Sequence, residues 1–418
     1  MIEIRDSTLT DEVNHLNQKD IQERQDKVLA TSGWRDCMTF LYDLSTSYGY
    51  IQEERLLLNI ILPKYTKHNY QPMQFEVTIN CSKPEIIAGV TPQTSNYLNF
   101  EGQCVICFEN VGSAKRKGLR AFEFECNGRQ FFRQFPPYPY FNFHNIIIDK
   151  QHIPQVLTLD TIKELLEMCE RMPGYKVASN SDREGTGVTN MSHRHYQAGD
   201  HPYAVFEARV KKTYDLLGCQ VMWLHHPCCC LKVVGSDRAQ MELAVNSVFK
   251  AWRTGDFPAL QQPLQTCSFI CTLNPVTSNF EFILFARNAQ QPRFLTRATL
   301  QCIKKEFVGI FELCGYGILP GRLKEQLKQI EKVLESHEQQ PNFQQQYDDS
   351  LLLPTDLQMF HDWIKEFYVQ VRRDNPTMST KNVLEETLQT TFIAILKDNS
   401  PVDEDDEATI DLWMSQCH

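Results

Sequence analysis

The chain has 418 residues, of which 42% are hydrophobic, and its formal net charge is −10 at pH 7. This length allows two or more domains, and the composition is typical of a folded globular protein. The acidic charge argues against nucleic acid as the main partner, and no apolar run is long enough to cross a bilayer. Fifteen cysteines without a signal-like N-terminus predict reduced thiols and a cytoplasmic location.

The first half of the chain predicts a sheet that follows a helical extension. Two alternating runs, 121–126 and 130–135, flank Asn127-Gly128, which is the strongest short signal of a β-hairpin. Residues 143–148 predict a further strand. Apolar residues at helical spacing then predict a helix over 158–172.

The second half repeats this style. Residues 229–234 read as a strand, and Ser236 or Asp237 caps an amphipathic helix that extends to Trp252. A hairpin over 267–285 and an apolar segment over 307–319 follow. The order of elements predicts an α+β fold with mainly antiparallel sheets, packed helices, two similar halves and helical terminal extensions.

The domain prediction has four segments: a helical N-terminal extension at 1–75, an N-terminal half at 76–215, a C-terminal half at 216–335, and a Gln-rich linker with an accessory helical tail at 336–418.

The run His193-Arg-His195-Tyr-Gln197 is the strongest chemical signal. It follows a loop rich in Gly, Ser and Asn, so we expect it to enter a strand. Side chains alternate along a strand, which places His193, His195 and Gln197 on one face. Two imidazoles and an amide together suit attack on phosphorus, with one imidazole as the nucleophile and a neighbouring donor stabilising the developing charge.

A second signal is the pair Cys104-Val-Ile-Cys107, which is typical of either a redox pair or half of a tetrahedral zinc site. His144 and His193 lie on predicted strands that could approach the pair and complete a closed, structural Cys2His2 site. Two buried apolar cysteines are the simpler alternative. Thiolate and imidazole ligands together favour zinc.

These motifs, taken in order, resemble a known family. Cys104-x-x-Cys107-Phe-Glu-Asn110, the run 130–144, Ser179-Asn180-Ser-Asp182, the run 192–199 and the segments 303–312 and 318–322 are similar to the class II galactose-1-phosphate uridylyltransferases of the histidine-triad superfamily. The similarity covers approximately residues 100–325.

The resemblance implies a ping-pong reaction, in which His195 attacks the α-phosphorus of UDP-glucose and Gln197 supports the phosphate. Galactose-1-phosphate then accepts the uridylyl group to give UDP-galactose. It also implies zinc on Cys104, Cys107, His144 and His193. Members of the family are commonly dimers, so a homodimer is open.

Further residues match family positions near the nucleotide. Asn110, Asn180 and Asp182 do so without an assigned contact, and Arg133 is expected either to neutralise phosphate or to be an ordinary exposed residue of its strand. His201 matches a family histidine with a supporting or a surface role.

The chain departs from the family over 294–302, where members carry several histidines and this chain has none. The departure puts the identity of the hexose-1-phosphate in doubt. Two alternatives therefore stay open. One is a nucleotide-sugar phosphorylase or hydrolase that uses the same His195, and the other is a catalytically inactive scaffold, although the expected loss of nucleophile and amide has not occurred.

Overall fold

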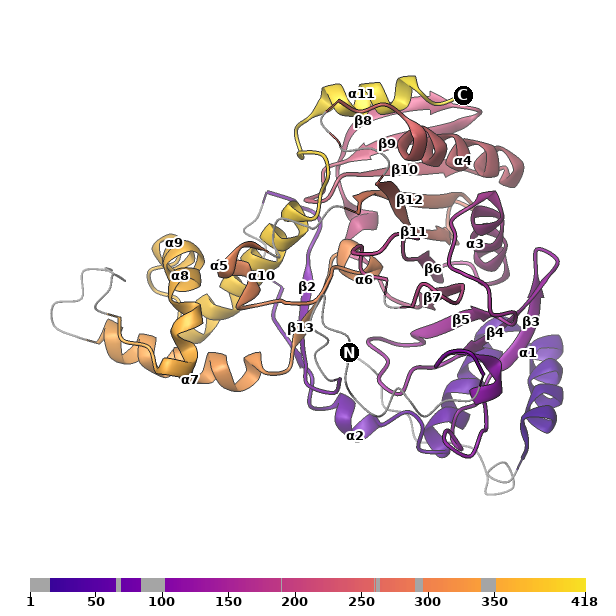
Figure 1. Cartoon of the computed structure of the whole chain (residues 1–418), viewed down its shortest axis with the longest axis horizontal. Helices are drawn as coiled ribbons and strands as arrows, with labels where there is room; N and C mark the ends of the chain where they lie inside the picture. Colours follow the sequence, from indigo (N-terminus) through magenta and orange to yellow (C-terminus); the bar gives the residue numbers. More distant parts are fainter. Residues whose placement is uncertain are drawn as a thin grey trace.

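The computed structural model describes residues 16–64, 69–83, 102–188, 190–258, 260, 264–289, 296–339 and 351–418. Its centre is a ten-stranded antiparallel sheet with the strand order β3-β4-β5-β7-β6-β11-β12-β10-β9-β8 (Figure 1). A smaller sheet has the order β1-β2-β13, with β13 parallel to β2. The fold is α+β, as predicted.

The large sheet consists of two halves with the same topology. The first contains β3 (Phe122–Cys126), β4 (Arg129–Gln134), β5 (Asn145–Asp149), α3 (Leu159–Arg171), β6 (Lys176–Ser179) and β7 (His195–Gly199). The second contains β8 (Val210–Leu216), β9 (Cys219–Leu224), β10 (Cys230–Gly235), α4 (Arg238–Thr254), β11 (Gln265–Leu273) and β12 (Phe280–Asn288). From each edge inward, both halves run first, second, third, fifth and fourth strand, and β6 pairs with β11 where they meet. The predicted similarity of the halves is confirmed at this level.

The remaining elements surround the large sheet. They are α1 (Gln18–Ser47), α2 (Glu53–Leu56), β1 (Ile60–Ile61), β2 (Glu76–Asn80), η3 (Phe108–Asn110), η4 (Ala204–Glu207), α5 (Ala298–Gln301), α6 (Ile310–Leu313), β13 (Tyr316–Pro320), α7 (Leu323–Glu338), η6 (Thr355–Phe360), α8 (His361–Trp363), the π-helical η7 (Ile364–Tyr368), α9 (Val369–Asp374), α10 (Thr380–Asp398) and α11 (Glu407–Ser415).

Local signals account for several elements. The β3–β4 turn places Asn127 at φ 49° and Gly128 at φ 70°, the pair of positive values that a two-residue hairpin turn of this type requires. Asp237 caps α4 by accepting the backbone N–H of Gln240 at 2.8 Å. The hairpins and the helices predicted over 158–172 and up to Trp252 are thus confirmed.

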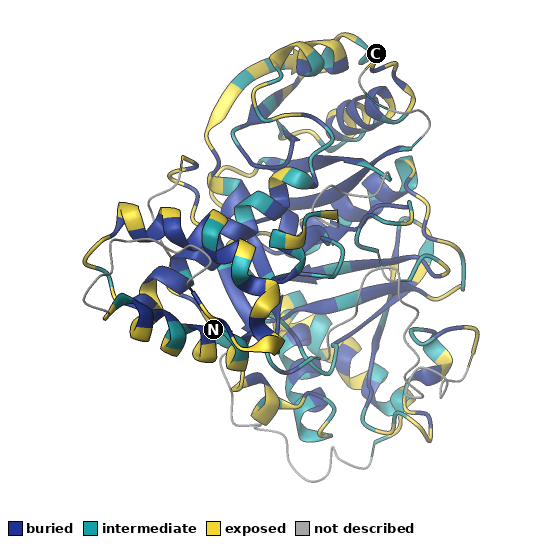
Figure 2. Ribbon diagram, turned by 60° about the vertical axis from the view of Figure 1, so that its left-hand side comes forward, coloured by how far each residue is buried: buried dark blue, intermediate teal, exposed yellow. Residues whose placement is uncertain are grey.

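Two hydrophobic clusters cover the two faces of the large sheet. On one face, α1, α3, α4 and α11 pack over the strands, with Leu165, Trp252 and Trp413 among the buried residues. The other face carries the small sheet and the helices of the C-terminal region, including Phe392 and Leu396 of α10. Figure 2 shows the central strands buried and the outward helix surfaces exposed.

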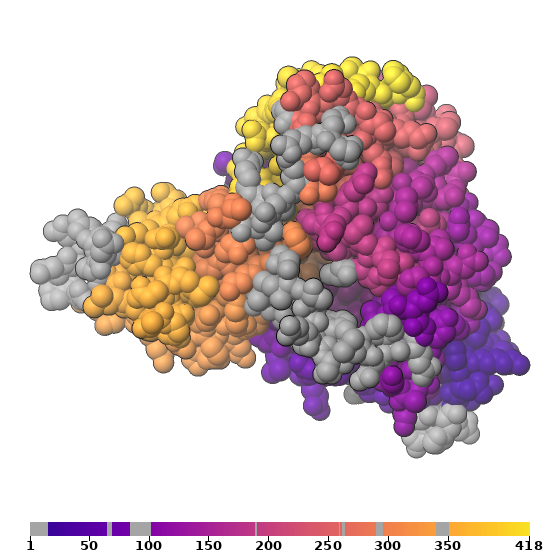
Figure 3. Space-filling view, viewed as in Figure 1, coloured from indigo at the N-terminus to yellow at the C-terminus, as the bar shows by residue number. Residues whose placement is uncertain are grey.

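The C-terminal helices share the core of the protein. α7 to α10 form a lobe beside the sheet (Figure 3), yet α10 contacts β2 and α7 and is buried along much of its length. The acidic run at 403–407 forms ion pairs with β8, including Lys211–Asp405 at 2.8 Å and Lys212–Glu407 at 2.7 Å. The Gln-rich segment of the predicted linker lies mostly outside the described residues, and the domain boundaries remain a prediction.

Candidate functional site

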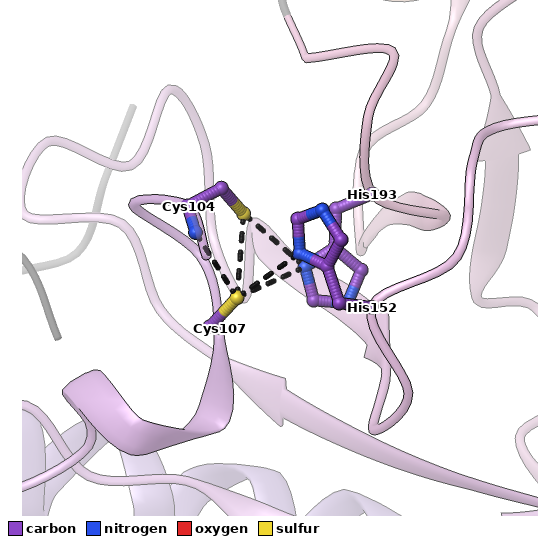
Figure 4. A group of neighbouring side chains, drawn as sticks. All are labelled: Cys104, Cys107, His152 and His193. Carbon is purple, nitrogen blue, oxygen red and sulfur yellow. Dashed lines mark hydrogen bonds between the residues drawn. The ribbon is translucent and has the colours of Figure 1, made fainter. Parts of the chain in front are cut away.

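Cys104, Cys107, His152 and His193 converge near the end of β5 (Figure 4). One ligand-type atom from each residue lies within 4.8 Å of the others. Cys104 Sγ lies 3.3 Å from His193 Nδ1, Cys107 Sγ lies 3.2 Å from His152 Nδ1, and the two sulfurs are 3.5 Å apart. A tetrahedral zinc ion with bonds of about 2.3 Å to sulfur and about 2.0 Å to nitrogen would separate its ligands by roughly 3.3–3.8 Å. The separations of 3.2–3.5 Å quoted above are close to these values, so the four side chains are suited to hold such an ion after small adjustments.

The antiparallel pairing of β5 with β7 brings the two histidines together. His152 follows the end of β5, His193 precedes the start of β7, and these ends are adjacent because Ile148 pairs with His195. His193 Nε2 lies 2.7 Å from the carbonyl oxygen of Asp149. A carbonyl can only accept, so Nε2 carries the proton and Nδ1 presents its lone pair to the sulfurs, as metal-binding histidines usually do.

Hydrogen bonds favour ionisation of Cys104 and hold the backbone of the loop that carries the two cysteines. Burial opposes ionisation of the Cys104 thiol, but hydrogen bonds with His193 and Asn190 lower its pKa to about 7. The Asn110 side chain donates to the carbonyl oxygens of Cys104 and Cys107 at 3.0 and 3.1 Å. Asn110, predicted to lie near the nucleotide, thus has a place in shaping the cysteine loop.

His144 is not part of this cluster, which corrects its prediction as a metal ligand. It precedes β5, whereas His152 follows it, and a strand advances about 3.3 Å per residue. The two histidines therefore lie at opposite ends of β5. His144 Nε2 instead lies 3.2 Å from Gln197 Oε1. The sequence reasoning missed His152, for which its position just past the predicted strand was the available signal.

His195 has its hydrogen-bonding pattern fixed by the backbone. Its Nδ1 lies 2.8 Å from the carbonyl oxygen of His193, so Nδ1 is the protonated nitrogen and Nε2 bears the lone pair. Among the described residues, no group forms a hydrogen bond with Nε2. Burial lowers the pKa of His195, which keeps the ring neutral at pH 7. The arrangement presents a neutral imidazole with one available nitrogen, which is a competent nucleophile.

Gln155 is a further residue that the sequence reasoning missed. Its side-chain oxygen accepts the backbone N–H of His195 at 2.9 Å, and its Nε2 donates to Ser179 Oγ at 3.0 Å. Gln155 therefore ties the first residue of β7 to the end of β6. No local sequence pattern marks such a contact, since it depends on the pairing of strands distant in sequence.

Cross-strand register separates the residues of β7 into two faces. His195 pairs with Ile148 and Gln197 with Ile146, whereas Tyr196 pairs with Ile147. Because cross-strand partners share a face, His195 and Gln197 lie on one side of the sheet and Tyr196 on the other. The predicted common face of His195 and Gln197 agrees with this register.

The register corrects the prediction that Arg133 contacts phosphate. Arg133 pairs with Ile147, so it lies on the face opposite His195. Its guanidinium is buried over the rings of Trp34 and Phe124, 5.0 and 4.7 Å from their centroids. Nor is it the exposed strand residue of the alternative prediction. Its contact with α1 is at Trp34, the residue after the kink at Gly33 (φ 85°) that divides this helix.

Asn180 and Asp182 have partners within the protein. Asn180 Oδ1 accepts the N–H of Ile310 at 2.9 Å, at the start of α6. Asp182 accepts from the Leu157 N–H at 3.0 Å and the Thr266 hydroxyl at 2.7 Å, and it pairs with Arg253 at 2.8 Å. Asp182 thus links the two halves of the fold.

His201 belongs to an aromatic cluster. Its ring centroid lies 5.1 Å from that of Phe141 and 4.9 Å from those of Tyr203 and Tyr316. Burial lowers its pKa to about 4. Part of the segment 294–302, where the chain departs from the family, lies outside the described residues.

The architecture and site together define a two-half α+β protein with a Cys2His2 cluster beside a buried histidine. A family model described as a domain of unknown function (DUF4922) matches residues 63–200, which include the cluster and β7. Within the described residues, no helix has the length and apolar character needed to cross a membrane.

Individual relatives of the chain have more informative descriptions than this family model. The chain is 31% identical over 330 residues to the galactose-1-phosphate uridylyltransferase of Halalkalibacterium halodurans, covering 72% of this chain and 63% of the relative. It is 29% identical to the enzyme of that name from Latilactobacillus sakei subsp. sakei, with 71% and 63% covered, and 28% identical to that from Ligilactobacillus salivarius, with 85% and 72% covered. The resemblance found in the motifs is thereby confirmed: the chain is a relative of the galactose-1-phosphate uridylyltransferases. It spans 63% of the length of the first two of these relatives.

Among solved structures, the crystal structure of yeast Ap4A phosphorylase Apa2 aligns at a TM-score of 0.36 and 10% identity, covering 69% of this chain and 90% of that one. A likeness at this level carries no argument about activity.

Proposed function

We propose that the chain is a nucleotidyltransferase that moves a uridylyl group between UDP-glucose and a hexose-1-phosphate, galactose-1-phosphate being the acceptor expected from its relatives. One observation carries the proposal: His195 is held neutral, with its proton on Nδ1 toward the His193 carbonyl and its Nε2 unbonded among the described residues. Gln197 lies on the same face and can donate to a non-bridging phosphate oxygen.

The first step forms a bond between His195 Nε2 and the α-phosphorus and breaks the bond to the bridging oxygen, releasing glucose-1-phosphate. Nδ1 keeps its proton, so the uridylyl-imidazole is cationic, and the His193 carbonyl accepts its hydrogen bond. This charge makes the imidazole a good leaving group. A phosphate oxygen of the hexose-1-phosphate then attacks the same phosphorus and restores neutral His195.

The proposal includes a structural zinc ion held by Cys104, Cys107, His152 and His193. A closed set of two thiolates and two imidazoles leaves no position for substrate, so the ion would fix the loop and strand ends. The ligand His193 and the nucleophile His195 are joined by the hydrogen bond to the His193 carbonyl.

Substrate contacts of Asn110, Asn180 and Asp182 remain predictions, as does a homodimer. A cytoplasmic location is also proposed, and it is supported by the fifteen cysteines, none of which forms a disulfide in the structure.

The test is intact-mass measurement after incubation with UDP-glucose alone. We expect the mass to rise by one uridylyl group per chain, with glucose-1-phosphate released in equal amount. His195→Asn should abolish the adduct, while His361→Ala, in the distant helical lobe, should leave it unchanged. A wild-type protein that gives no adduct with a panel of nucleotide sugars would refute the proposal.

The purified adduct then decides the acceptor. Galactose-1-phosphate, inorganic phosphate and water are supplied separately, and the nucleotide product of each reaction is identified. We expect rapid loss of the adduct with galactose-1-phosphate alone, giving UDP-galactose. Faster discharge by inorganic phosphate or water would instead establish a phosphorylase or a hydrolase.

A further inference from the structure

His144 is enclosed by aromatic rings beside Gln197. Its side chain is buried, and its ring stacks on Tyr140 with centroids 4.9 Å apart and an interplanar angle of 11°. Phe141 lies 5.0 Å away, and Phe311 of α6 presents its edge at 5.1 Å and 83°. Residues from both halves of the chain therefore restrict the orientation of this ring.

Hydrogen bonds determine which nitrogen of His144 carries the proton. The backbone N–H of Tyr140 donates to Nδ1 at 3.1 Å, and a backbone N–H can only donate. Burial lowers the pKa of His144 to about 3, so the ring is neutral at pH 7 and its proton lies on Nε2. Nε2 must then donate to the Gln197 side-chain oxygen 3.2 Å away.

This contact fixes the direction of the Gln197 amide. An amide has an accepting oxygen and a donating NH2 group, and rotation by 180° exchanges them. With its oxygen engaged by His144, Gln197 has its NH2 group directed elsewhere as a donor. The reversed amide would place an oxygen lone pair where charge develops on the phosphate, which is repulsive.

We propose that His144 is a positioning residue that holds Gln197 with its NH2 group available to the transferred phosphate. The inference rests on the proposed uridylyl transfer for its functional consequence. It gives His144 a role separate from the metal cluster, from which the structure excludes it.

The kinetic test is a double-substitution cycle on the single-turnover rate of adduct formation from UDP-glucose. His144→Phe keeps an aromatic ring but removes the donor, and we expect it to slow the reaction by about a hundredfold, the lower end of the roughly hundredfold to thousandfold loss caused by removing one transition-state donor. Gln197→Ala should slow it similarly, and the double variant should be no slower than Gln197→Ala. His144→Gln, whose amide can still donate, should recover much of the rate.

Zinc content and thermal midpoint are measured on every variant. Both are expected to match the wild type in His144→Gln, and zinc content is expected to match in His144→Phe. The positioning role would be overturned if the rate losses of His144→Phe and Gln197→Ala multiplied in the double variant. It would also be overturned if His144→Gln were as slow as His144→Phe. Loss of zinc from both His144 variants would instead return His144 to a metal-binding role.

A second measurement does not require activity. In protein labelled with 15N-histidine, NMR should show the His144 ring as the Nε2–H tautomer, with a proton resonance that shifts in Gln197→Ala. An Nδ1–H tautomer would overturn the inference even if the adduct forms. Conversely, the expected tautomer with no adduct in the wild type would refute uridylyl transfer while retaining the His144–Gln197 contact.

Discussion

His193 joins two different parts of the site through its side chain and its backbone. Its ring faces the cysteine sulfurs and donates a hydrogen bond to the backbone carbonyl of Asp149. Its own backbone carbonyl accepts a hydrogen bond from His195 Nδ1. A movement of this one residue would therefore disturb the proposed metal ligands and the proposed nucleophile together. Replacing a ligand of the proposed zinc ion should therefore also affect the proposed reaction, which the ion does not touch.

We expect His152→Ala to lower zinc affinity by more than the roughly 10–100-fold that loss of an outer hydrogen-bond partner costs. Because His193 then loses part of its restraint, the rate of adduct formation should fall as well. The checks are zinc content after dialysis against a chelator and the single-turnover rate, with His361→Ala as the matched control. Wild-type zinc retention by His152→Ala would contradict the ligand assignment.

At the residue scale, the sequence predicted the cysteine pair and the shared face of His195 and Gln197, because short spacing is a local property. The fourth member of the cluster depends on which end of β5 meets the start of β7. His144 and His152 flank the same strand, and only the antiparallel register distinguishes them. The prediction that Arg133 contacts phosphate was wrong for a related reason. The pairing of Arg133 with Ile147 determines which face of the sheet it lies on.

Helix α3 supports β7 from the face opposite His195. Glu164 of α3 is fully buried, accepts a short hydrogen bond from the Tyr196 hydroxyl and lies 3.4 Å from Arg194. These two residues flank His195 in sequence. The helix thus contacts the chain on both sides of His195, the proposed nucleophile.

Glu164→Leu should destabilise the protein by about 3–5 kcal/mol, because it leaves the buried Arg194 charge without its partner. Glu167→Leu is the matched control on the same helix, where the partly exposed pairs with Arg171 and Arg238 are worth about 1 kcal/mol or less. Thermal midpoints compare the two variants. Equal midpoints would show that Glu164 does not anchor β7.

At the scale of elements, local chemistry predicted the hairpin at Asn127-Gly128 and the cap at Asp237. The position of β7 between β5 and β6, and the parallel pairing of β13 with β2, join segments far apart in sequence. No periodicity within a strand specifies its neighbour. The order of strands therefore could not be predicted from single segments.

At the scale of the whole molecule, three histidines in the described part of the chain have a pKa that burial lowers strongly: His144 to about 3, and His201 and His226 to about 4. The unfolded chain binds protons at these groups near pH 6.5, whereas the folded protein does not until lower pH. The unfolded state therefore binds more protons as pH falls, and acid destabilises the folded state.

Between pH 7 and pH 5, each histidine should remove up to roughly 2 kcal/mol of stability. Unfolding monitored by circular dichroism at both pH values checks this expectation. His201→Phe, which retains a ring against Tyr203 and Tyr316, should show a smaller decrease. Equal stability of the wild type at pH 7 and pH 5 would contradict the lowered pKa values.

The repeated order of strands and helix in the sequence predicted the two halves. The sequence did not predict the role of the C-terminal helices in the core. Their residues read as an accessory tail because the apolar positions of α10 gave no indication of a partner. In the fold, Phe392 and Leu396 complete a core shared with β2. Such a contact depends on the overall arrangement of the chain.

The junction of β6 with β11 bears on the ancestry of the chain. Two copies of one half, paired through that inner strand, would form a sheet with the same strand order, so the arrangement is what duplication and fusion of a self-associating ancestor would produce. In the present chain β7 carries His195 and Gln197, whereas β12, its counterpart, has neither a histidine nor a glutamine. An ancestral pair would have held two equivalent sites. Fusion permits one copy to keep the residues of the proposed site while the other diverges.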